Sequence, residues 1–185
     1  MSVRLVRIAL LLLIISCSGC GEGKAPPSAV DMALARFHSF RFNLELPSVD
    51  GEKVSLADYR GKVVIVDFWG TWCPPCRDEI PHFVSLYHTY HAEGLDIIGV
   101  NYEQVPGERA IALVRRFIAE LHIPYVCVMG DDRTKRQVPG LSSFPTTLFI
   151  DRSGKVRFML TGNMPQDALE AVVTALLAEP APAIE

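Results

Sequence analysis

The sequence predicts a three-layer α/β domain in which helices flank a mixed central sheet. Two apolar stretches, at 63–69 and 95–101, are typical of strands buried on both faces. Apolar residues at helical spacing follow each stretch, at 80–90 and 111–121. A pair of short strands with a turn signal precedes this pattern, and a second pair follows it.

The predicted domain begins with a β hairpin. Apolar residues alternate with polar ones from Phe40 to Leu46, residues 49–52 read Val-Asp-Gly-Glu, and Val54 begins the return strand. We expect the later strands at 63–69, 95–101, 125–129, 146–150 and 156–161. Helices are expected from near residue 74, across 111–121 and at 165–177. A short helical stretch is expected between the strands at 125–129 and 146–150.

Length and composition fit one packed domain with a targeting segment. The chain has 185 residues, of which 49% are apolar and 21% charged. The formal net charge of −3 is too weak to favour nucleic-acid binding or electrostatic membrane binding. No nucleic acid is therefore expected among the partners.

The first twenty residues indicate export. Arg4 and Arg7 precede an apolar run at 8–15, and small residues follow at 16–20. This order is typical of a secretory signal peptide. The run of eight apolar residues is too short for a bilayer span, which needs about 20. A buried N-terminal strand or helix is the alternative.

Two cysteines close this segment. The tripeptide Ser-Gly-Cys that ends at Cys20 resembles a bacterial lipoprotein cleavage site, although Cys17 stands where an aliphatic residue is usual. Cys17 is the alternative lipid acceptor. Export would place the domain where disulfides persist. We expect a signal peptide at 1–19, a flexible tether at 20–36, the folded domain at 37–178 and a disordered tail at 179–185.

A pair of cysteines, Cys73 and Cys76, follows the first buried strand and opens a helix. Such a pair can be half of a zinc site, a structural disulfide or a redox dithiol. Zinc needs two more ligands, and the five histidines form no ligand pair with Cys127, the other cysteine of the folded part. The strand–helix context favours a redox dithiol. Cys127 is expected to be a small buried residue, with a third redox thiol as the alternative.

The predicted place of Cys73 at a helix N-terminus favours reactivity. Free backbone N–H groups and the helix dipole stabilise a thiolate there. Cys76 lies one turn further on the same face, about 5–6 Å away at Cβ, which allows a disulfide. Pro75 removes one N–H donor and stiffens the turn. We expect Cys73 to attack a substrate disulfide and Cys76 to resolve the mixed disulfide.

The Cys76 thiol needs a base, and two carboxylates are candidates. Asp67 interrupts the buried strand six residues before Cys73, where burial raises the pKa of a carboxyl group. Glu79 lies three residues after Cys76 on the same helix face. The alternatives are a satisfied structural carboxylate for Asp67 and a solvated helix residue for Glu79.

The tripeptide Phe144-Pro145-Thr146 opens a later strand. A proline in this place can be cis, in a tight turn. An ordinary trans loop proline is the alternative, and composition alone does not decide between them.

The segment from Val66 to Cys76, Val-Asp-Phe-Trp-Gly-Thr-Trp-Cys-Pro-Pro-Cys, resembles the active-site segment of the thioredoxin superfamily. Within it, the chain is similar to the exported TlpA/ResA-like thiol–disulfide oxidoreductases. The resemblance covers roughly residues 37–178 and includes the lead-in Leu-Ala-Asp-Tyr-Arg-Gly-Lys at 56–62 and an inserted helix near 108–121. It implies a thioredoxin-like fold with an N-terminal hairpin.

The resemblance implies roles for the thiols and acids. Cys73 matches the attacking cysteine and Cys76 the resolving one. Glu79 matches an acidic residue thought to shuttle protons in the ResA-like group, and Asp67 matches the buried aspartate of thioredoxin. The presence of both acids is a departure that leaves open which one serves Cys76.

The resemblance also implies a substrate-docking surface. Trp72 matches the tryptophan beside the site, and Pro145 matches the cis-proline that faces the cysteines. Phe144 and Thr146 flank this proline and join it as substrate-binding candidates. Pro81 matches the proline that kinks the active-site helix.

The implied function is a membrane-tethered reductant that keeps exported client cysteines reduced, such as those of apocytochrome c before haem attachment. Its partners would be disulfide-bearing clients and a membrane thiol electron donor, and no cofactor is expected. A disulfide-forming oxidase uses the same residues, and the reduction potential separates the two.

Two other classes are alternatives. A peroxiredoxin-like peroxidase expects a threonine three residues before its nucleophile, whereas Thr71 stands two residues before Cys73. A copper chaperone-like module would bind metal through the two cysteines and a distant histidine, without catalysis.

Overall fold

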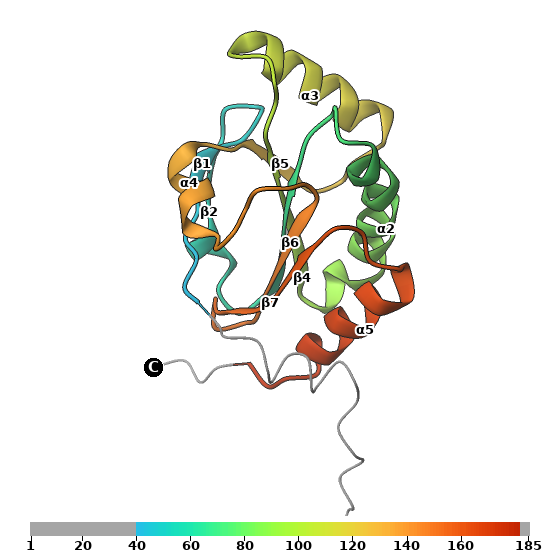
Figure 1. Ribbon diagram of the computed structural model, residues 1–185. Coiled ribbons are helices and arrows are strands. Elements are labelled where there is room, and N and C mark those ends of the chain that lie inside the picture. Colours follow the sequence, from blue (N-terminus) through green and yellow to red (C-terminus); the bar gives the residue numbers. More distant parts are fainter. Residues whose placement is uncertain (1–39, 182–185) are drawn as a thin grey trace, which may run out of the picture.

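The computed structural model describes residues 40–181 (Figure 1). A five-stranded sheet forms the centre of this part, and a two-stranded sheet lies beside it. The strands are β1 (Glu45–Pro47), β2 (Lys53–Ser55), β3 (Val63–Trp69), β4 (Leu95–Asn101), β5 (Val126–Met129), β6 (Thr146–Ile150) and β7 (Val156–Thr161). The helices are α2 (Pro74–Tyr90), α3 (Glu108–Glu120), α4 (Asp132–Gln137) and α5 (Gln166–Leu177), with 3₁₀ helices η1 (Leu56–Tyr59) and η2 (His91–Glu93).

Several expectations concern other parts of the chain. The signal peptide at 1–19, with Cys17 and Cys20, and the tether at 20–36 lie outside the described residues. Within residues 40–181, no helix combines the length and the apolar character that crossing a membrane requires.

The central sheet is mixed, as predicted. Its strand order is β5-β4-β3-β6-β7. Strand β3 runs parallel to β4 and β4 parallel to β5, whereas β6 is antiparallel to both β3 and β7. The parallel strands come from the β–α–β part of the sequence, because a helix is needed to return the chain to the same end of the sheet.

Strand β3 divides two cores. All seven of its residues are buried. Val64, Val66 and Phe68 belong to one hydrophobic cluster, and Ile65 and Trp69 belong to the other. Because side chains alternate along a strand, Asp67 points to the same face as Ile65 and Trp69.

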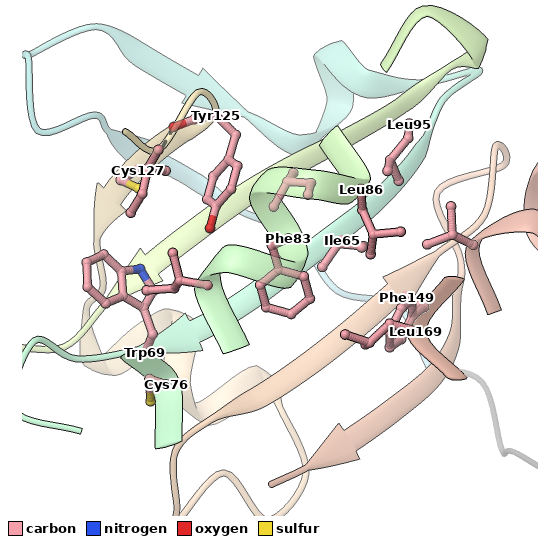
Figure 2. Packing of buried hydrophobic residues seen from close by; sticks show 14 of the residues in the cluster. Ile65, Trp69, Cys76, Phe83, Leu86, Leu95, Tyr125, Cys127, Phe149 and Leu169 are labelled. Carbon is pink, nitrogen blue, oxygen red and sulfur yellow. Dashed lines mark hydrogen bonds between the residues drawn. The ribbon is translucent and has the colours of Figure 1, made fainter. Parts of the chain in front are cut away.

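The two cores define three layers. Residues of α2, α3 and α5 pack with the Ile65 side of the sheet, and Figure 2 shows Phe83 and Leu86 of α2 over this core. The hairpin and the segment after α4 cover the other side through residues such as Leu46 and Val138. Figure 1 shows α2 and α5 on one side of the sheet and β1, β2 and α4 on the other. The predicted three-layer architecture, with α3 inserted between β4 and β5, is confirmed.

The N-terminal hairpin is shorter than predicted. Phe42, Leu44 and Leu46 are buried alternately, as expected, but pairing with β2 begins only at Glu45. The backbone before Glu45 forms hydrogen bonds with other segments. The Leu44 carbonyl accepts from the Leu56 N–H, and the Phe40 carbonyl accepts from the Val156 N–H. This segment therefore joins the hairpin to η1 and β7 rather than extending a ladder.

The double burial of β3 makes its side chains the most sensitive to truncation. Ile65→Ala should lower the free energy of unfolding by about 2–5 kcal/mol, because Ile65 is fully buried between two packed layers. The exposed Gln104→Ala should change it by about 0.5 kcal/mol or less. Urea unfolding followed by circular dichroism measures both, and equal effects would contradict this account of the core.

Candidate active site

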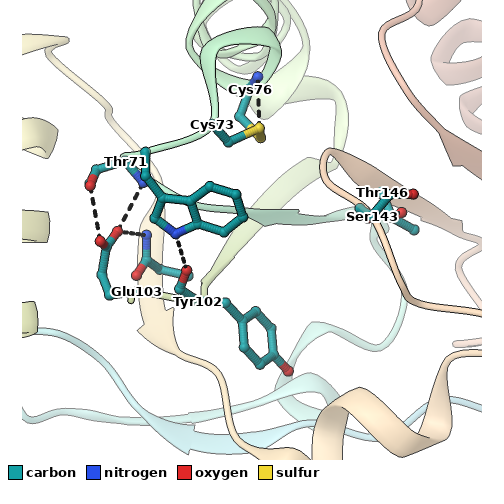
Figure 3. The surroundings of a disulfide bond; sticks show 9 residues. Thr71, Cys73, Cys76, Tyr102, Glu103, Ser143 and Thr146 are labelled. Carbon is teal, nitrogen blue, oxygen red and sulfur yellow. Dashed lines mark hydrogen bonds between the residues drawn. A yellow bond between two sulfur atoms is a disulfide. The ribbon is translucent and has the colours of Figure 1, made fainter. Parts of the chain in front are cut away.

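The two cysteines form a disulfide where β3 passes into α2. The Sγ–Sγ distance is 2.06 Å and the Cα–Cα distance is 5.4 Å (Figure 3). Cys73 is the N-cap residue of α2, and Cys76 lies in its first turn. The predicted place of the pair at a helix N-terminus is thus confirmed.

The start of α2 directs one backbone donor at the Cys73 sulfur. Pro74 and Pro75 have no N–H, so the N–H of Cys76 is the first that the helix offers. It lies 3.3 Å from Cys73 Sγ and donates to it. A thiolate on Cys73 would therefore receive this hydrogen bond and the favourable end of the helix dipole. Both cysteines are shielded, Cys73 being 3% and Cys76 1% exposed.

The loop before Cys73 is held by a carboxylate from the end of β4. Glu103 Oε1 accepts from the Thr71 N–H at 2.9 Å, and Glu103 Oε2 accepts from the Thr71 hydroxyl at 3.0 Å (Figure 3). Asn101 Nδ2 donates to Glu103 Oε1 at 3.1 Å. These three bonds fix the loop relative to the sheet and so fix the position of the disulfide.

Aromatic rings lie next to the disulfide. Trp72 is the one large apolar side chain that residues 40–181 leave exposed, at 41%, and its indole N–H donates to the Tyr102 carbonyl at 2.8 Å. Its ring meets Phe144 edge-on at 5.7 Å, and Phe144 stacks on Tyr102 at 5.6 Å. Trp72 and Phe144 thus form a surface against which a bound chain can pack.

The Phe144–Pro145 peptide bond is cis, so the cis alternative for Pro145 is the correct one. Phe68, near the end of β3, pairs with Thr146, which places Pro145 at the same end of the sheet as the disulfide. Thr146 is buried, and its hydroxyl donates to the Ser143 carbonyl at 2.9 Å. This hydroxyl therefore holds the loop that carries the proline.

Asp67 is a buried carboxyl group with an unused acceptor. It is 1% exposed, and its Oδ1 has no hydrogen-bond partner among the described residues. Burial raises its pKa well above the usual value, and the negative charge of Glu79 raises it further. Its place on β3 is therefore that of a buried carboxyl group, whereas its role stays a prediction.

Glu79 is buried too, so the alternative of a solvated helix residue is wrong. It is 1% exposed, and its Oε1 accepts from the Met164 N–H at 3.3 Å. Oε2 has no partner among the described residues. Burial raises the pKa of Glu79 to about 7, although the Met164 N–H acts in the opposite direction. Glu79 therefore changes charge near neutral pH, one helical turn from Cys76.

Cys127 is buried, as expected, and takes no part in the disulfide. Register places Asp67 beside Gly99 and Gly99 beside Cys127 across the sheet. Cys127 Sγ and the Trp69 indole fill the space over Gly99, because a Cβ there would lie 2.9 Å from each. Burial raises the pKa of the Cys127 thiol, which keeps it protonated.

The structure brings the predicted thiols, acids, Trp72 and cis-proline loop to one region, but three contacts were not anticipated. Glu103 follows the end of β4, and its position at the shared carboxyl edge of parallel strands was an available signal. Tyr102, which contacts Trp72 and Phe144, carries the same signal. Met164 reaches Glu79 through a backbone N–H, and no sequence pattern marks it.

No cluster of three or more His, Cys, Asp or Glu side chains suited to a metal ion occurs between residues 40 and 181.

The fold and the disulfide at the start of α2 define a thioredoxin-like redox domain. Residues 41–159 match the AhpC/TSA family. The chain is 34% identical over 127 residues to the thiol–disulfide oxidoreductase ResA of Bacillus subtilis (strain 168), covering 69% of this chain and 68% of that protein. The chain therefore belongs to the AhpC/TSA family, and within it to the ResA-like thiol–disulfide oxidoreductases.

Solved structures agree with this assignment. A thiol:disulfide interchange protein of the thioredoxin family from Chlorobium tepidum TLS superposes with a TM-score of 0.67 at 29% identity, covering 75% of this chain and 95% of that one. A putative thiol:disulfide interchange protein DsbE from Chlorobium tepidum gives a TM-score of 0.65 at 31% identity, covering 74% and 94%. The fold and the class of reaction are thus shared with these proteins.

The raised pKa of Glu79 predicts that stability falls with rising pH. The folded protein holds this proton up to about pH 7, whereas the unfolded chain releases it near the usual value of 4.5. Between these values the folded state binds more protons, so the free energy of unfolding should fall as pH rises, by about 2–3 kcal/mol. Asp67 acts in the same direction.

Urea unfolding of the oxidised protein at pH 5 and pH 8 measures this effect. Glu79→Gln should flatten the dependence, because its side chain does not titrate. The exposed neighbour Asp78, changed to Asn, is the matched control and should leave it unchanged. An equal slope in Glu79→Gln and the unmodified protein would contradict the assigned pKa.

Proposed function

We propose that this protein is a reductase of disulfides in exported client proteins, with Cys73 as attacking thiol and Cys76 as resolving thiol. The observation that carries the proposal is the disulfide at the N-terminus of α2, with the Cys76 N–H donating to Cys73 Sγ at 3.3 Å. Of the two sulfurs, Cys73 is the one for which the helix stabilises negative charge.

The proposed reaction begins with the reduced pair. The Cys73 thiolate attacks a client disulfide, a bond forms between Cys73 and one client sulfur, and the other client sulfur leaves as a thiolate. Cys76 then loses its proton and attacks Cys73 Sγ. The client sulfur that was bonded to Cys73 leaves as a thiolate. The client has then gained two electrons, and the Cys73–Cys76 disulfide has formed again. A thiol donor must then reduce this disulfide.

The two buried acids are proposed to carry the proton of Cys76. Glu79 is the better placed, because its pKa of about 7 lets it accept and release a proton near neutral pH. Its Oε2 has no partner among the described residues and is free to receive a hydrogen bond. Asp67, whose pKa lies well above the usual value, would hold a second proton in the same region.

The client is proposed to bind beside the disulfide. Trp72 and Phe144 supply aromatic surface, and the cis-Pro145 loop lies at the same end of the sheet as the disulfide. Thr146 supports this loop through its bond to Ser143. Client selection would then depend on residues next to the reactive cysteine of the client.

The proposed place of action is outside the cytosol, at a membrane. The basic start, apolar run and small-residue end of the first twenty residues support export, and Cys20, or alternatively Cys17, would carry lipid. The electron donor would be a membrane thiol protein, and apocytochrome c is one client class that fits an exported reductase.

The geometry around Thr71 disfavours a peroxidase. Such an enzyme needs a threonine hydroxyl that serves the nucleophile, but the Thr71 hydroxyl donates to Glu103 at 3.0 Å. The nucleophile of this chain also has a partner sulfur within its own helical turn. Both features favour dithiol exchange.

Trapping of clients tests the proposal. Cys76→Ser should leave clients bound to Cys73 as mixed disulfides, because no second sulfur releases them. Non-reducing gels of exported extracts, followed by mass spectrometry, identify the trapped proteins. Insulin reduction should fall at least 100-fold in Cys73→Ser and in Cys76→Ser.

Cys127→Ser is the matched control and should retain activity within twofold, because Cys127 is buried and takes no part in the disulfide. Absence of trapped proteins with Cys76→Ser would contradict a client reductase. Equilibration with glutathione buffers measures the reduction potential and so shows whether the protein acts as a reductant or an oxidant. A thioredoxin-type reductant has a reduction potential of about −270 mV, and a strong oxidant one of about −120 mV.

The roles of the acids predict distinct pH–rate profiles. Release of a client from its mixed disulfide with Cys73 should speed up through pH 7 in the unmodified protein, as Glu79 ionises. Glu79→Gln should remove this inflection. Asp67→Asn should lower the release rate but leave the inflection near pH 7 in place. Stopped-flow single-turnover measurements, with Asp78→Asn as control, detect the difference. If Glu79→Gln and Asp67→Asn each left the profile unchanged, neither acid would be the base.

A further inference from the structure

A cationic hollow lies at the end of the domain opposite the disulfide. Its volume is about 490 Å³, and it is lined by Phe40, Arg41, Arg60, Ser153, Gly154 and Lys155. Two of these segments meet through a hydrogen bond from the Val156 N–H to the Phe40 carbonyl. In Figure 1 the start of the described chain and the turn between β6 and β7 lie together at this end.

Strand register separates the hollow from the redox pair. Arg60 precedes the first residue of β3, and Val64 pairs with Ile150, which leads into the β6–β7 turn. Cys73 follows the last residue of β3. Seven residues at about 3.3 Å each place the two ends about 20 Å apart.

The cations of the hollow have no counter-ions among residues 40–181. Arg41, Arg60 and Lys155 are exposed, and none forms an ion pair with another described residue. The buried Asp151 near this turn is already engaged by Arg157 and by the Ser153 hydroxyl, at 3.3 and 2.6 Å. The hollow therefore has positive charge available for an anionic partner.

The Arg60 guanidinium packs on the β6–β7 turn, which also carries Lys155. Gly154 has a φ of +75° and no side chain, and a Cβ there would lie 2.4 Å from Arg60 Nη1. The Arg60 guanidinium thus lies against the backbone next to Lys155. Arg41 and Phe40 close the third side, where the chain enters the described domain.

The local charge is opposite to that of the domain. Residues 40–181 contain 14 Lys and Arg against 18 Asp and Glu, a formal net charge of −4. None of the described residues that line the hollow is acidic. The weak overall charge of the chain therefore conceals a cationic end.

We propose that this cationic end docks on an anionic phospholipid surface and so turns the disulfide away from the membrane. The inference rests on the proposed lipid anchor. Twenty residues separate Cys20 from Phe40, and a coil of that length would have an r.m.s. end-to-end distance of about 25 Å, so a lipid on Cys20 would hold the domain close to the bilayer. The described residues begin at Phe40, which itself lines the hollow, so the chain from the proposed anchor would enter the domain at its cationic end.

Docking in this orientation has a functional result. The disulfide would lie on the far side of the domain, about 20 Å from the lipid headgroups, where clients in the aqueous compartment can reach it. Arg41, Arg60 and Lys155 supply the attraction, and phosphate oxygens supply the matching charge.

Vesicle binding tests this orientation. The full chain, with Cys17 and Cys20 changed to Ser in every sample so that no lipid is attached, is sedimented with vesicles of phosphatidylcholine alone or mixed with phosphatidylglycerol. The triple variant Arg41→Gln/Arg60→Gln/Lys155→Gln should lose about 100-fold in its preference for the anionic vesicles.

Charge-matched controls isolate the cationic end. The triple variant Arg109→Gln/Arg133→Gln/Arg136→Gln removes three exposed cations elsewhere and should bind within about threefold of the unmodified chain. Equal losses in both variants would overturn the proposal. So would release from the vesicles by inorganic phosphate but not by chloride at equal ionic strength, because the hollow would then take free phosphate.

Insulin reduction in the same samples separates the two proposals. Both triple variants should reduce insulin as the unmodified chain does, because the changed residues lie far from the disulfide. Loss of vesicle preference with full activity is the expected result for the cationic end. If the unmodified chain failed to reduce insulin, that result would contradict the reductase function. The vesicle measurements would still decide whether the cationic end docks on anionic lipid.

Discussion

The double pairing and double burial of β3 is the constraint on which the rest of the structure depends. The strand has neighbours on both edges, and all seven of its side chains are buried. Its last residue leads into the loop that ends at Cys73, so the sheet fixes the position of the disulfide. The same burial deprives Asp67 of water, which is why that carboxyl group favours its proton.

The site is built from loops that leave one end of the sheet. The loop after β3 carries Cys73, the loop after β4 carries Glu103, and the loop before β6 carries Pro145. Glu103 bonds to the first loop, and aromatic contacts between Trp72 and Phe144 join it to the third. A rigid scaffold with linked loops keeps the redox pair in place while its charge changes.

Much of the fold and half of the site could be predicted from the sequence. The apolar run that contains Asp67 predicts a buried strand, and the Cys-x-x-C spacing predicts a redox pair at the start of a helix. Both predictions depend on local patterns, and both are confirmed. Burial of Glu79 could not be predicted, because it arises when the loop before α5 closes over α2 and offers the Met164 N–H. The short hairpin could not be predicted either, since its backbone partners lie in η1 and β7. Such contacts join segments that are distant in the sequence.

The isolation of Cys127 limits the chemistry open to the domain. The two other sulfurs lie within one helical turn, whereas Cys127 sits inside the sheet with a raised pKa. Among residues 40–181 one disulfide is formed, between Cys73 and Cys76, and Cys127 stays a free thiol. An odd number of thiols usually invites mispaired species, but burial raises the pKa of the third and holds it as a neutral thiol, so we expect each catalytic cycle to return the domain to the same covalent state.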